Sequence, residues 1–214
     1  MRYLIVCGGK IDKEFGLNEI KTDGIDAIIA ADSGMDFLYE NGVTPDIIVG
    51  DFDSTKTNAL EYFERKGQTE IRRLNPVKDD TDTEYAIRLA ISEGARSIVV
   101  LGATGSRIDH VLGNISLLGI GLESKTDISI IDTNNRIRMA DKPVTIEKSA
   151  QYGRFVSLIA LTDDNEVSLK GFKYPVTDYS FDRFTSLGIS NEIVDDHALI
   201  DIHRGKFIII ESKD

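Results

Sequence analysis

Residues 46–54 read Asp-Ile-Ile-Val-Gly-Asp-Phe-Asp-Ser, a short apolar run that ends in two carboxylates, Asp51 and Asp53, with one residue between them. Side chains at positions i and i+2 of an extended chain leave on the same side, so both carboxylates point together at the end of a buried strand. Two anions this close repel each other unless a cation lies between them, and oxygen ligands suit Mg²⁺. A second interpretation stays open, in which Asp53 or Ser54 caps the following helix and Asp51 is solvated.

The same pattern, an apolar run followed by glycine or small polar residues, recurs through the first 133 residues. The runs cover residues 2–7, 25–31, 46–50, 69–74, 97–101 and 127–131, and helices are predicted at 35–40, 55–66, 81–92 and 107–118. Strands that are apolar on both faces and alternate with helices indicate a largely parallel sheet covered on two sides. Residues 1–133 are therefore predicted to form an α/β domain.

A different pattern begins at Asn134. Short segments rich in β-branched and aromatic residues, at 144–147, 155–161 and 198–202, are separated by turn residues and show no helical period. Residues 203–206 are predicted to join the last two strands as a hairpin, and the final strand ends the chain. Residues 134–214 are therefore predicted to form an all-β sandwich domain.

The composition argues against several classes of protein. With 36 acidic and 25 basic residues the formal charge is −11, which opposes non-specific binding to nucleic acid or to an anionic membrane. Cys7 is the single cysteine, so a disulfide framework and a cysteine-based metal site are excluded. No apolar run reaches the length of a signal-peptide core or a bilayer span, and we expect a soluble cytoplasmic protein.

Polar clusters follow the predicted strands, where ligands of open parallel sheets bind. Residues 102–107 lie between an apolar strand and a helix, so their backbone N–H groups and the helix dipole favour an anion such as phosphate. Capping of that helix by Ser106 and Asp109 is the alternative. Asp82, in the first turn of its helix, is a candidate third carboxylate ligand beside Asp51 and Asp53.

Five motifs, in their order and spacing, resemble those of the thiamine pyrophosphokinase (thiamine diphosphokinase) family in its bacterial form. They are Ala31-Asp-Ser-Gly34, Pro45-Asp-Ile-Ile-Val-Gly-Asp-Phe-Asp-Ser54, Lys78-Asp-Asp-Thr-Asp82, Gly102 to His110, and Gly188-Ile-Ser-Asn-Glu192. The resemblance covers nearly the whole chain. It implies an α/β catalytic domain that binds ATP and Mg²⁺ and a β-sandwich for thiamine binding and dimerisation. The implied reaction transfers a pyrophosphoryl group from ATP to thiamine, and the active sites of the implied homodimer lie between subunits.

Carried over to this sequence, the resemblance implies roles for individual residues. Asp51, Asp53 and Asp82 hold Mg²⁺ on the ATP phosphates, and Asp32 lies at the floor of the cleft. Asp80 and Asp32 are the candidates for the base that takes the thiamine hydroxyl proton. The nucleotide is bound by Gly102, Ala103, Thr104, Gly105, Ser106, Arg107 and Asp109, with Ser33 and Gly34.

The resemblance also implies a thiamine site. Ser186, Ser190 and Asn191 help to bind thiamine from the partner subunit, and an aromatic side chain covers its ring. The chain has no Trp, so a Tyr or Phe must take that role. Tyr174, Phe181 and Phe184 precede the Ser-Asn loop, and we expect at least two of them to pack in the core.

Two alternatives from other classes stay open. The stretch Asp51-Phe-Asp53-Ser-Thr55 also resembles the Asp-x-Asp-x-Thr signature of haloacid-dehalogenase-type phosphohydrolases, in which the first Asp becomes an aspartyl phosphate. That family carries the signature on its first strand, whereas here it follows the third apolar run. The second alternative is a non-catalytic protein that binds a nucleotide.

Overall fold

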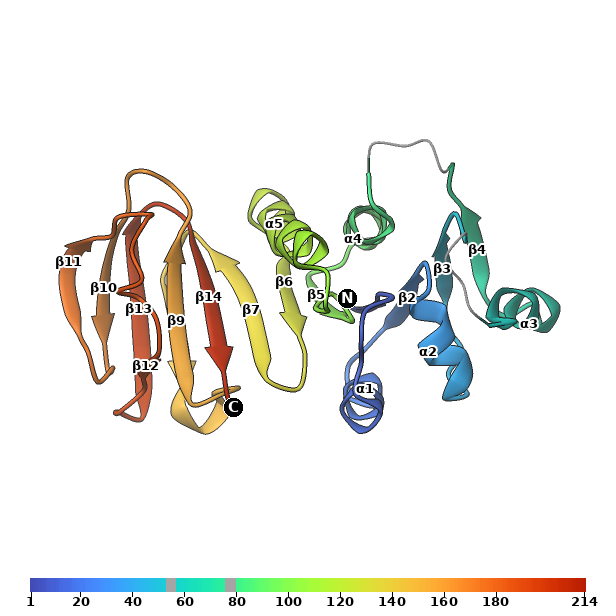
Figure 1. Ribbon diagram of the computed structural model, residues 1–214, viewed down its shortest axis with the longest axis horizontal. Helices are drawn as coiled ribbons and strands as arrows, with labels where there is room; N and C mark the ends of the chain where they lie inside the picture. The colour runs from blue at the N-terminus through green and yellow to red at the C-terminus, as the bar shows by residue number, and fades with distance from the viewer. Residues whose placement is uncertain (53–56, 76–79) are drawn as a thin grey trace. The chain divides into compact units, whose positions relative to one another are not determined.

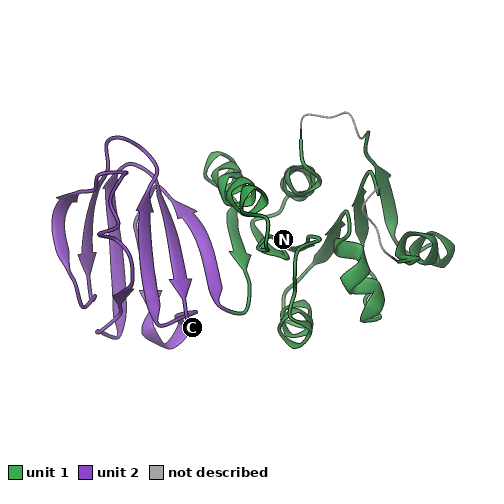
Figure 2. Ribbon diagram, in the orientation of Figure 1, with its two compact units in different colours: residues 1–133 green, residues 134–214 purple. Residues whose placement is uncertain are grey.

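The computed structural model describes residues 1–52, 57–75 and 80–214, so the predicted ligand Asp53 lies outside the described residues. The chain divides into two compact units, residues 1–133 and residues 134–214 (Figure 2). Within the described residues, no helix has both the length and the apolar character needed to cross a bilayer.

Unit 1 is built on a parallel sheet with the strand order β6-β5-β1-β2-β3-β4. Its strands are β1 (Arg2–Val6), β2 (Ala27–Ala31), β3 (Ile47–Gly50), β4 (Glu70–Arg73), β5 (Ser97–Leu101) and β6 (Asp127–Ile131). Its helices are α1 (Lys13–Ile20), α2 (Gly34–Glu40), α3 (Ala59–Lys66), α4 (Asp82–Ser92) and α5 (Ile108–Ser124). The inner strands are buried along most of their length because helices cover both faces (Figure 1). This arrangement confirms the predicted α/β fold.

The strand order reverses at the centre of this sheet. The chain adds β2, β3 and β4 on one side of β1, then crosses over and adds β5 and β6 on the other side. The loops that follow β1 and β5 therefore diverge at a single point on the carboxyl edge. Such a point is where open parallel sheets bind their ligands.

Unit 2 consists of two antiparallel sheets, β12-β9-β14-β7 and β11-β10-β13-β8, that share one apolar core. The strands are β7 (Asn135–Ala140), β8 (Val144–Glu147), β9 (Phe155–Ala160), β10 (Glu166–Lys170), β11 (Val176–Ser180), β12 (Asn191–Glu192), β13 (His197–Arg204) and β14 (Phe207–Ser212). A short 3-10 helix, η1, covers Lys148–Ala150. In β13, buried Ala198, Ile200 and Ile202 alternate with the less buried Leu199 and Asp201, as expected of a sheet with one face toward solvent. The predicted β-sandwich is confirmed.

The predicted hairpin between the last two strands is wrong. β13 pairs with β10 and β8, whereas β14 pairs with β7 and β9 in the other sheet. Residues 203–206 therefore carry the chain across the sandwich. Gly205 has φ 91°, a left-handed conformation that suits glycine at this crossing.

Candidate active site

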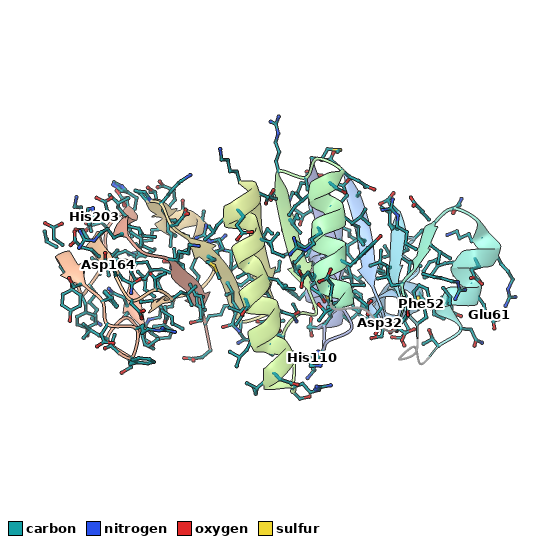
Figure 3. The ribbon with its side chains drawn as sticks, turned by 90° about the horizontal axis from the view of Figure 1, so that it is seen from above. Asp32, Phe52, Glu61, His110, Asp164 and His203 are labelled. Carbon is teal, nitrogen blue, oxygen red and sulfur yellow. The ribbon has the colours of Figure 1, made fainter. Side chains whose placement is uncertain are left out.

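A cavity of about 1020 Å³ opens at the carboxyl edge of the sheet in unit 1. It lies at the reversal point between β1 and β5, where the sheet topology predicts a ligand site. Its described lining comes from the loops after β1, β2 and β5, from the start of α4 and from the first three turns of α5: residues 7–10, 31–33, 81–84, 102–107, 109–111, 113–114 and 117. Figure 3 shows Asp32 and His110, which both line this cavity, at one edge of the fold.

Most of the predicted nucleotide-site residues line this cavity. Gly34 is placed differently: it is buried, and a Cβ atom there would overlap the backbone of Val6 in β1. That close packing explains the glycine, and its predicted contact with a nucleotide stays a prediction. Asp80 is exposed and stands two residues before α4. The predicted residues found in the lining are Asp32, Ser33, Asp82, Gly102, Ala103, Thr104, Gly105, Ser106, Arg107 and Asp109.

Three carboxylates meet beside the cavity and form an aspartate cluster of Asp32, Asp51 and Asp82. One side-chain oxygen of each lies within 4.8 Å of those of the other two. Asp32 and Asp51 come together because β2 and β3 are parallel neighbours, with Ala31 paired to Val49 and the Asp32 N–H donating to the Val49 carbonyl at 2.7 Å.

The third carboxylate is set by a helix start. Asp82 is the first residue of α4, whose N-cap Thr81 accepts a hydrogen bond from the Glu84 N–H at 3.2 Å. The helix dipole favours a carboxylate at this position. Three convergent carboxylate oxygens form a donor set that fits Mg²⁺. Asp51, Asp53 and Asp82 are the ligands predicted from the sequence; Asp53 lies outside the described residues, and Asp32 lies beside the other two.

The β5–α5 loop, residues 102–107, provides the anion-favouring edge of the cavity. Helix α5 starts at Ile108 with Arg107 as N-cap, and the Arg107 side chain makes no capping hydrogen bond. Ser106 and Asp109 therefore do not form the alternative capping box. The first backbone N–H groups of α5, together with its dipole, face the end of the loop that lines the cavity.

Three contacts hold the carbonyl groups and side chains of this loop in place. The Gly9 N–H donates to the Gly102 carbonyl at 2.9 Å, and Asn114 Nδ2 donates to the Ala103 carbonyl at 2.8 Å. Thr104 Oγ1 donates to Asp132 Oδ2 at 2.9 Å. Gly102 adopts φ 68°, and a Cβ atom there would overlap the Cys7 carbonyl. The loop is thus fixed from β1, from α5 and from the end of β6.

Arg107 and Asp109 form an exposed ion pair at the mouth of the cavity, with Arg107 Nη2 at 2.6 Å from Asp109 Oδ2. The Arg107 hydrogen bond lowers the pKa of Asp109, and the Asp109 hydrogen bond raises the pKa of Arg107. A carboxyl group with a lowered pKa stays ionised as the pH falls until that lower pKa is reached, so this pair persists throughout the neutral range.

Cys7 also lines the cavity, at the end of β1. Burial raises the pKa of its thiol to about 11, although a contact with Thr83 Oγ1 at 3.4 Å acts in the opposite direction. The thiol therefore stays protonated and uncharged at neutral pH, and a covalent role as a thiolate nucleophile is not favoured.

The predicted thiamine residues lie in unit 2, and only two of the three expose their side chains. Ser186 and Ser190 are exposed, and Ser190 has φ 61°. Asn191 is 6% exposed, and its amide is engaged with backbone. Its Oδ1 accepts from the Tyr174 N–H at 3.0 Å, and its Nδ2 donates to the Tyr174 carbonyl at 2.9 Å. Asn191 thus fixes the backbone of Tyr174.

The aromatic residues near this loop depart from expectation. Phe181 is buried in the core, but Tyr174 is 62% exposed and Phe184 is 89% exposed. The expectation that at least two of the three pack in the core is therefore wrong. Two exposed aromatic side chains beside exposed hydroxyl groups offer a surface suited to a flat ligand.

Two residues that shape the cavity, Asn114 and Asp132, were not predicted from the sequence. Each acts through a contact with the β5–α5 loop, from a different element of unit 1. Asp132 could have been predicted, because it is a polar residue directly after a strand. Asn114 offered no signal, because an Asn inside a predicted helix is ordinarily read as solvent-facing.

Known protein families match the sequence of both units. A family model described as "Thiamin pyrophosphokinase, catalytic domain" matches residues 21–131, and one described as "Thiamin pyrophosphokinase, vitamin B1 binding domain" matches residues 143–207. The thiamine pyrophosphokinase of Bacillus subtilis (strain 168) is 34% identical over 188 residues, which are 87% of each chain.

Solved structures give the same result. A crystal structure of the Bacillus subtilis thiamine pyrophosphokinase superposes with a TM-score of 0.89 at 30% identity, covering 100% of both chains. One of the Geobacillus thermodenitrificans thiamin pyrophosphokinase gives a TM-score of 0.87 at 29% identity, covering 100% of this chain and 98% of the other. With matching family models in both units and a relative that aligns over most of its length, the chain belongs to the thiamine pyrophosphokinase family.

Proposed function

We propose that this chain transfers a pyrophosphoryl group from ATP to the hydroxyethyl oxygen of thiamine, giving AMP and thiamine diphosphate, and that the cavity of unit 1 holds the nucleotide. The observation that carries the proposal is the meeting of the aspartate cluster with the β5–α5 loop at one strand-end cavity. The relatives named thiamine pyrophosphokinase support the same reaction. Phosphoryl-type transfer needs mainly positioning and charge neutralisation, and this site offers both.

Mg²⁺ is the proposed metal, held by Asp32, Asp51 and Asp82, with Asp53 as a further candidate ligand. The support is the convergence of three carboxylate oxygens within 4.8 Å of one another. When bound, the ion neutralises charge on the phosphate oxygens of ATP and orients them. Since Asp32 belongs to the cluster, the base role falls to Asp80, the other candidate from the sequence.

The proposed chemical step is an in-line attack of thiamine on the β-phosphorus of ATP. The hydroxyl proton of thiamine passes to the carboxylate of Asp80 while the hydroxyethyl oxygen forms a bond to the β-phosphorus. The bond between the β-phosphorus and the oxygen that bridges it to the α-phosphorus breaks in line with the attack, and AMP leaves with that oxygen. The exposure of Asp80 just before α4 is compatible with its taking this proton.

The β5–α5 loop is proposed to bind the phosphates, and Asn114 is proposed to position it. Asn114→Asp replaces the amide donor with an oxygen that faces the Ala103 carbonyl, so we expect the KM for ATP to rise about tenfold, equivalent to one lost hydrogen bond. Steady-state kinetics measures it. Ser116→Ala is the control, because Ser116 lies on the same helix and its hydroxyl donates to the Leu112 carbonyl within that helix. An unchanged KM in Asn114→Asp would remove Asn114 from this role.

Unit 2 is proposed to bind thiamine through Ser186 and Ser190, with Asn191 holding Tyr174 in place beside them.

A homodimer is part of the proposal, with these residues of unit 2 contributing to the cavity of the partner subunit. Its support is a set of exposed apolar side chains, namely Tyr174, Phe184, Leu187, Ile189 and Val194. Sedimentation equilibrium measures the oligomeric state, and a monomer at working concentration would contradict this part. A cytoplasmic location is also proposed, on the basis of the single, buried cysteine.

The reaction is tested by incubating the protein with ATP, Mg²⁺ and thiamine and identifying the products by mass. We expect AMP and thiamine diphosphate in equal amounts, neither of them without thiamine, and none after chelation of the metal. Orthophosphate released without thiamine would indicate a phosphohydrolase instead, and no turnover would indicate a nucleotide-binding protein. Neither alternative has support from the family matches, which cover both units.

A further inference from the structure

Lys10 stands beside the β5–α5 loop at the cavity. It follows the Gly8-Gly9 turn after β1, is exposed, and lines the cavity. The preceding residue is in contact with the loop: the Gly9 N–H bonds the Gly102 carbonyl, and a Cβ atom on Gly9 would lie 2.7 Å from the Thr104 carbonyl. The residue directly before Lys10 is therefore held against the loop proposed to bind phosphate.

Lys10 differs from the other charged residues of the cavity in its charge and its pairing. Two cationic side chains, Lys10 and Arg107, occur among the described lining residues. Arg107 is committed to the Asp109 carboxylate at 2.6 Å, so that pair has no net charge. Lys10 forms no ion pair with any described residue. The other charged residues of the described lining are the carboxylates Asp32, Asp82 and Glu84, of which Glu84 pairs with Arg88.

A phosphate-bearing ligand needs positive charge here because the whole chain carries a formal charge of −11. The aspartate cluster and its metal can neutralise one end of a triphosphate. The loop N–H groups supply only partial charges. Lys10 carries a full positive charge that no described carboxylate neutralises. This charge can therefore neutralise negative charge on the phosphate groups of a ligand.

We propose that Lys10 binds the phosphate groups of the nucleotide at the β5–α5 loop, as a substrate-binding residue in addition to those predicted from the sequence motifs. This assignment rests on the proposed function of the cavity. A lysine ammonium group attracts phosphate in the ground state and throughout the reaction, so its removal lowers nucleotide affinity more than turnover.

The test compares Lys10→Met with Lys13→Met. Both remove one positive charge, but Lys13 begins α1 and is absent from the cavity lining. Equilibrium dialysis with radiolabelled ATP, and separately with adenosine, measures binding without turnover. We expect Lys10→Met to weaken ATP binding about tenfold and to raise the KM for ATP equally, with kcat within about twofold of the wild type. Lys13→Met and adenosine binding should be unaffected, and Lys10→Arg should restore most of the ATP affinity.

Three results would overturn the proposal. One is ATP binding by Lys10→Met within about twofold of the wild type. Another is equal weakening in Lys13→Met, which would mean that overall charge and not a local contact is responsible. The third is equal weakening of adenosine binding, which would point to a disturbed loop. Because binding is measured without thiamine, these results are distinct from a failure of the wild type to form AMP, which would contradict the proposed function instead.

Discussion

Replacing Asp51 by asparagine is expected to lower kcat for thiamine diphosphate formation by on the order of a thousandfold, because a neutral amide is a weak ligand for Mg²⁺ and leaves charge on the phosphates uncompensated. Asp51 follows β3 and shares the aspartate cluster with Asp32 and Asp82. Initial rates of AMP formation at saturating ATP, thiamine and Mg²⁺ measure the effect.

The matched control for this change is Asp127→Asn. Asp127 is an exposed carboxylate on β6, at the opposite, amino edge of the same sheet. It should leave the rate unchanged, and circular dichroism should show both variants folded. Near-normal turnover in Asp51→Asn, or a matching loss in Asp127→Asn, would refute the metal assignment.

Glu211→Gln is expected to destabilise unit 2 by about 3–5 kcal/mol, the usual cost of breaking a buried ion pair from one side. Glu211 lies on β14 with 0% exposure and accepts four hydrogen bonds. Two come from Arg136 at 2.7 and 2.8 Å, one from Arg138 at 2.9 Å and one from the Tyr152 N–H at 2.9 Å. A glutamine would present an amide donor to these donors and leave two guanidinium groups without their anion.

Urea unfolding followed by far-UV circular dichroism measures this loss of stability. Asp163→Asn serves as its control, because Asp163 pairs with Arg183 in the same unit but its side chain is 88% exposed. Exposed pairs contribute little, so this variant should unfold at the wild-type urea concentration. Equal midpoints for Glu211→Gln and Asp163→Asn would show that the Glu211 network does not stabilise the sandwich.

The sequence predicted the parallel strands well because each is buried on both faces and bounded by turn residues. β5 and β6 have the predicted ends, and α4 begins after its predicted Thr81 cap. α5 continues to Ser124, six residues beyond its predicted end. Gly121 lies inside the helix, where a Cβ atom would crowd the backbone of Thr126 and the side chain of Ile128.

In unit 2 the sequence could not assign strands to sheets. β13 and β14 are adjacent in sequence and each has a strand-like pattern, but such a pattern does not specify which strand it pairs with. β11 was missed because it is a largely exposed strand at a sheet edge and has little apolar patterning to find. α1 was missed because the apolar residues of Lys13–Ile20 are few and Gly16 interrupts them.

In the candidate site, too, residues placed by local patterns could be predicted, whereas residues placed by tertiary contacts could not. Asp51 and Asp82 were found from local patterns, a strand end and a helix start. Asp32 was expected at the floor of the cleft and as a candidate base but not as a metal ligand, since its place beside Asp51 depends on β2 and β3 being neighbours in the sheet. The tertiary contacts of Asn114 and Asp132 with the β5–α5 loop leave no trace in local sequence patterns.

In the proposed reaction thiamine, not water, attacks the β-phosphorus of ATP. Thiamine labelled with ¹⁸O at its hydroxyethyl oxygen, incubated with ATP, Mg²⁺ and the protein, tests this claim by mass spectrometry of the products. We predict thiamine diphosphate that retains the label and AMP that carries none, in equal amounts. Labelled thiamine left intact beside AMP and pyrophosphate, as water attack on the β-phosphorus would give, or an adduct of thiamine with AMP released together with pyrophosphate, would contradict this mechanism.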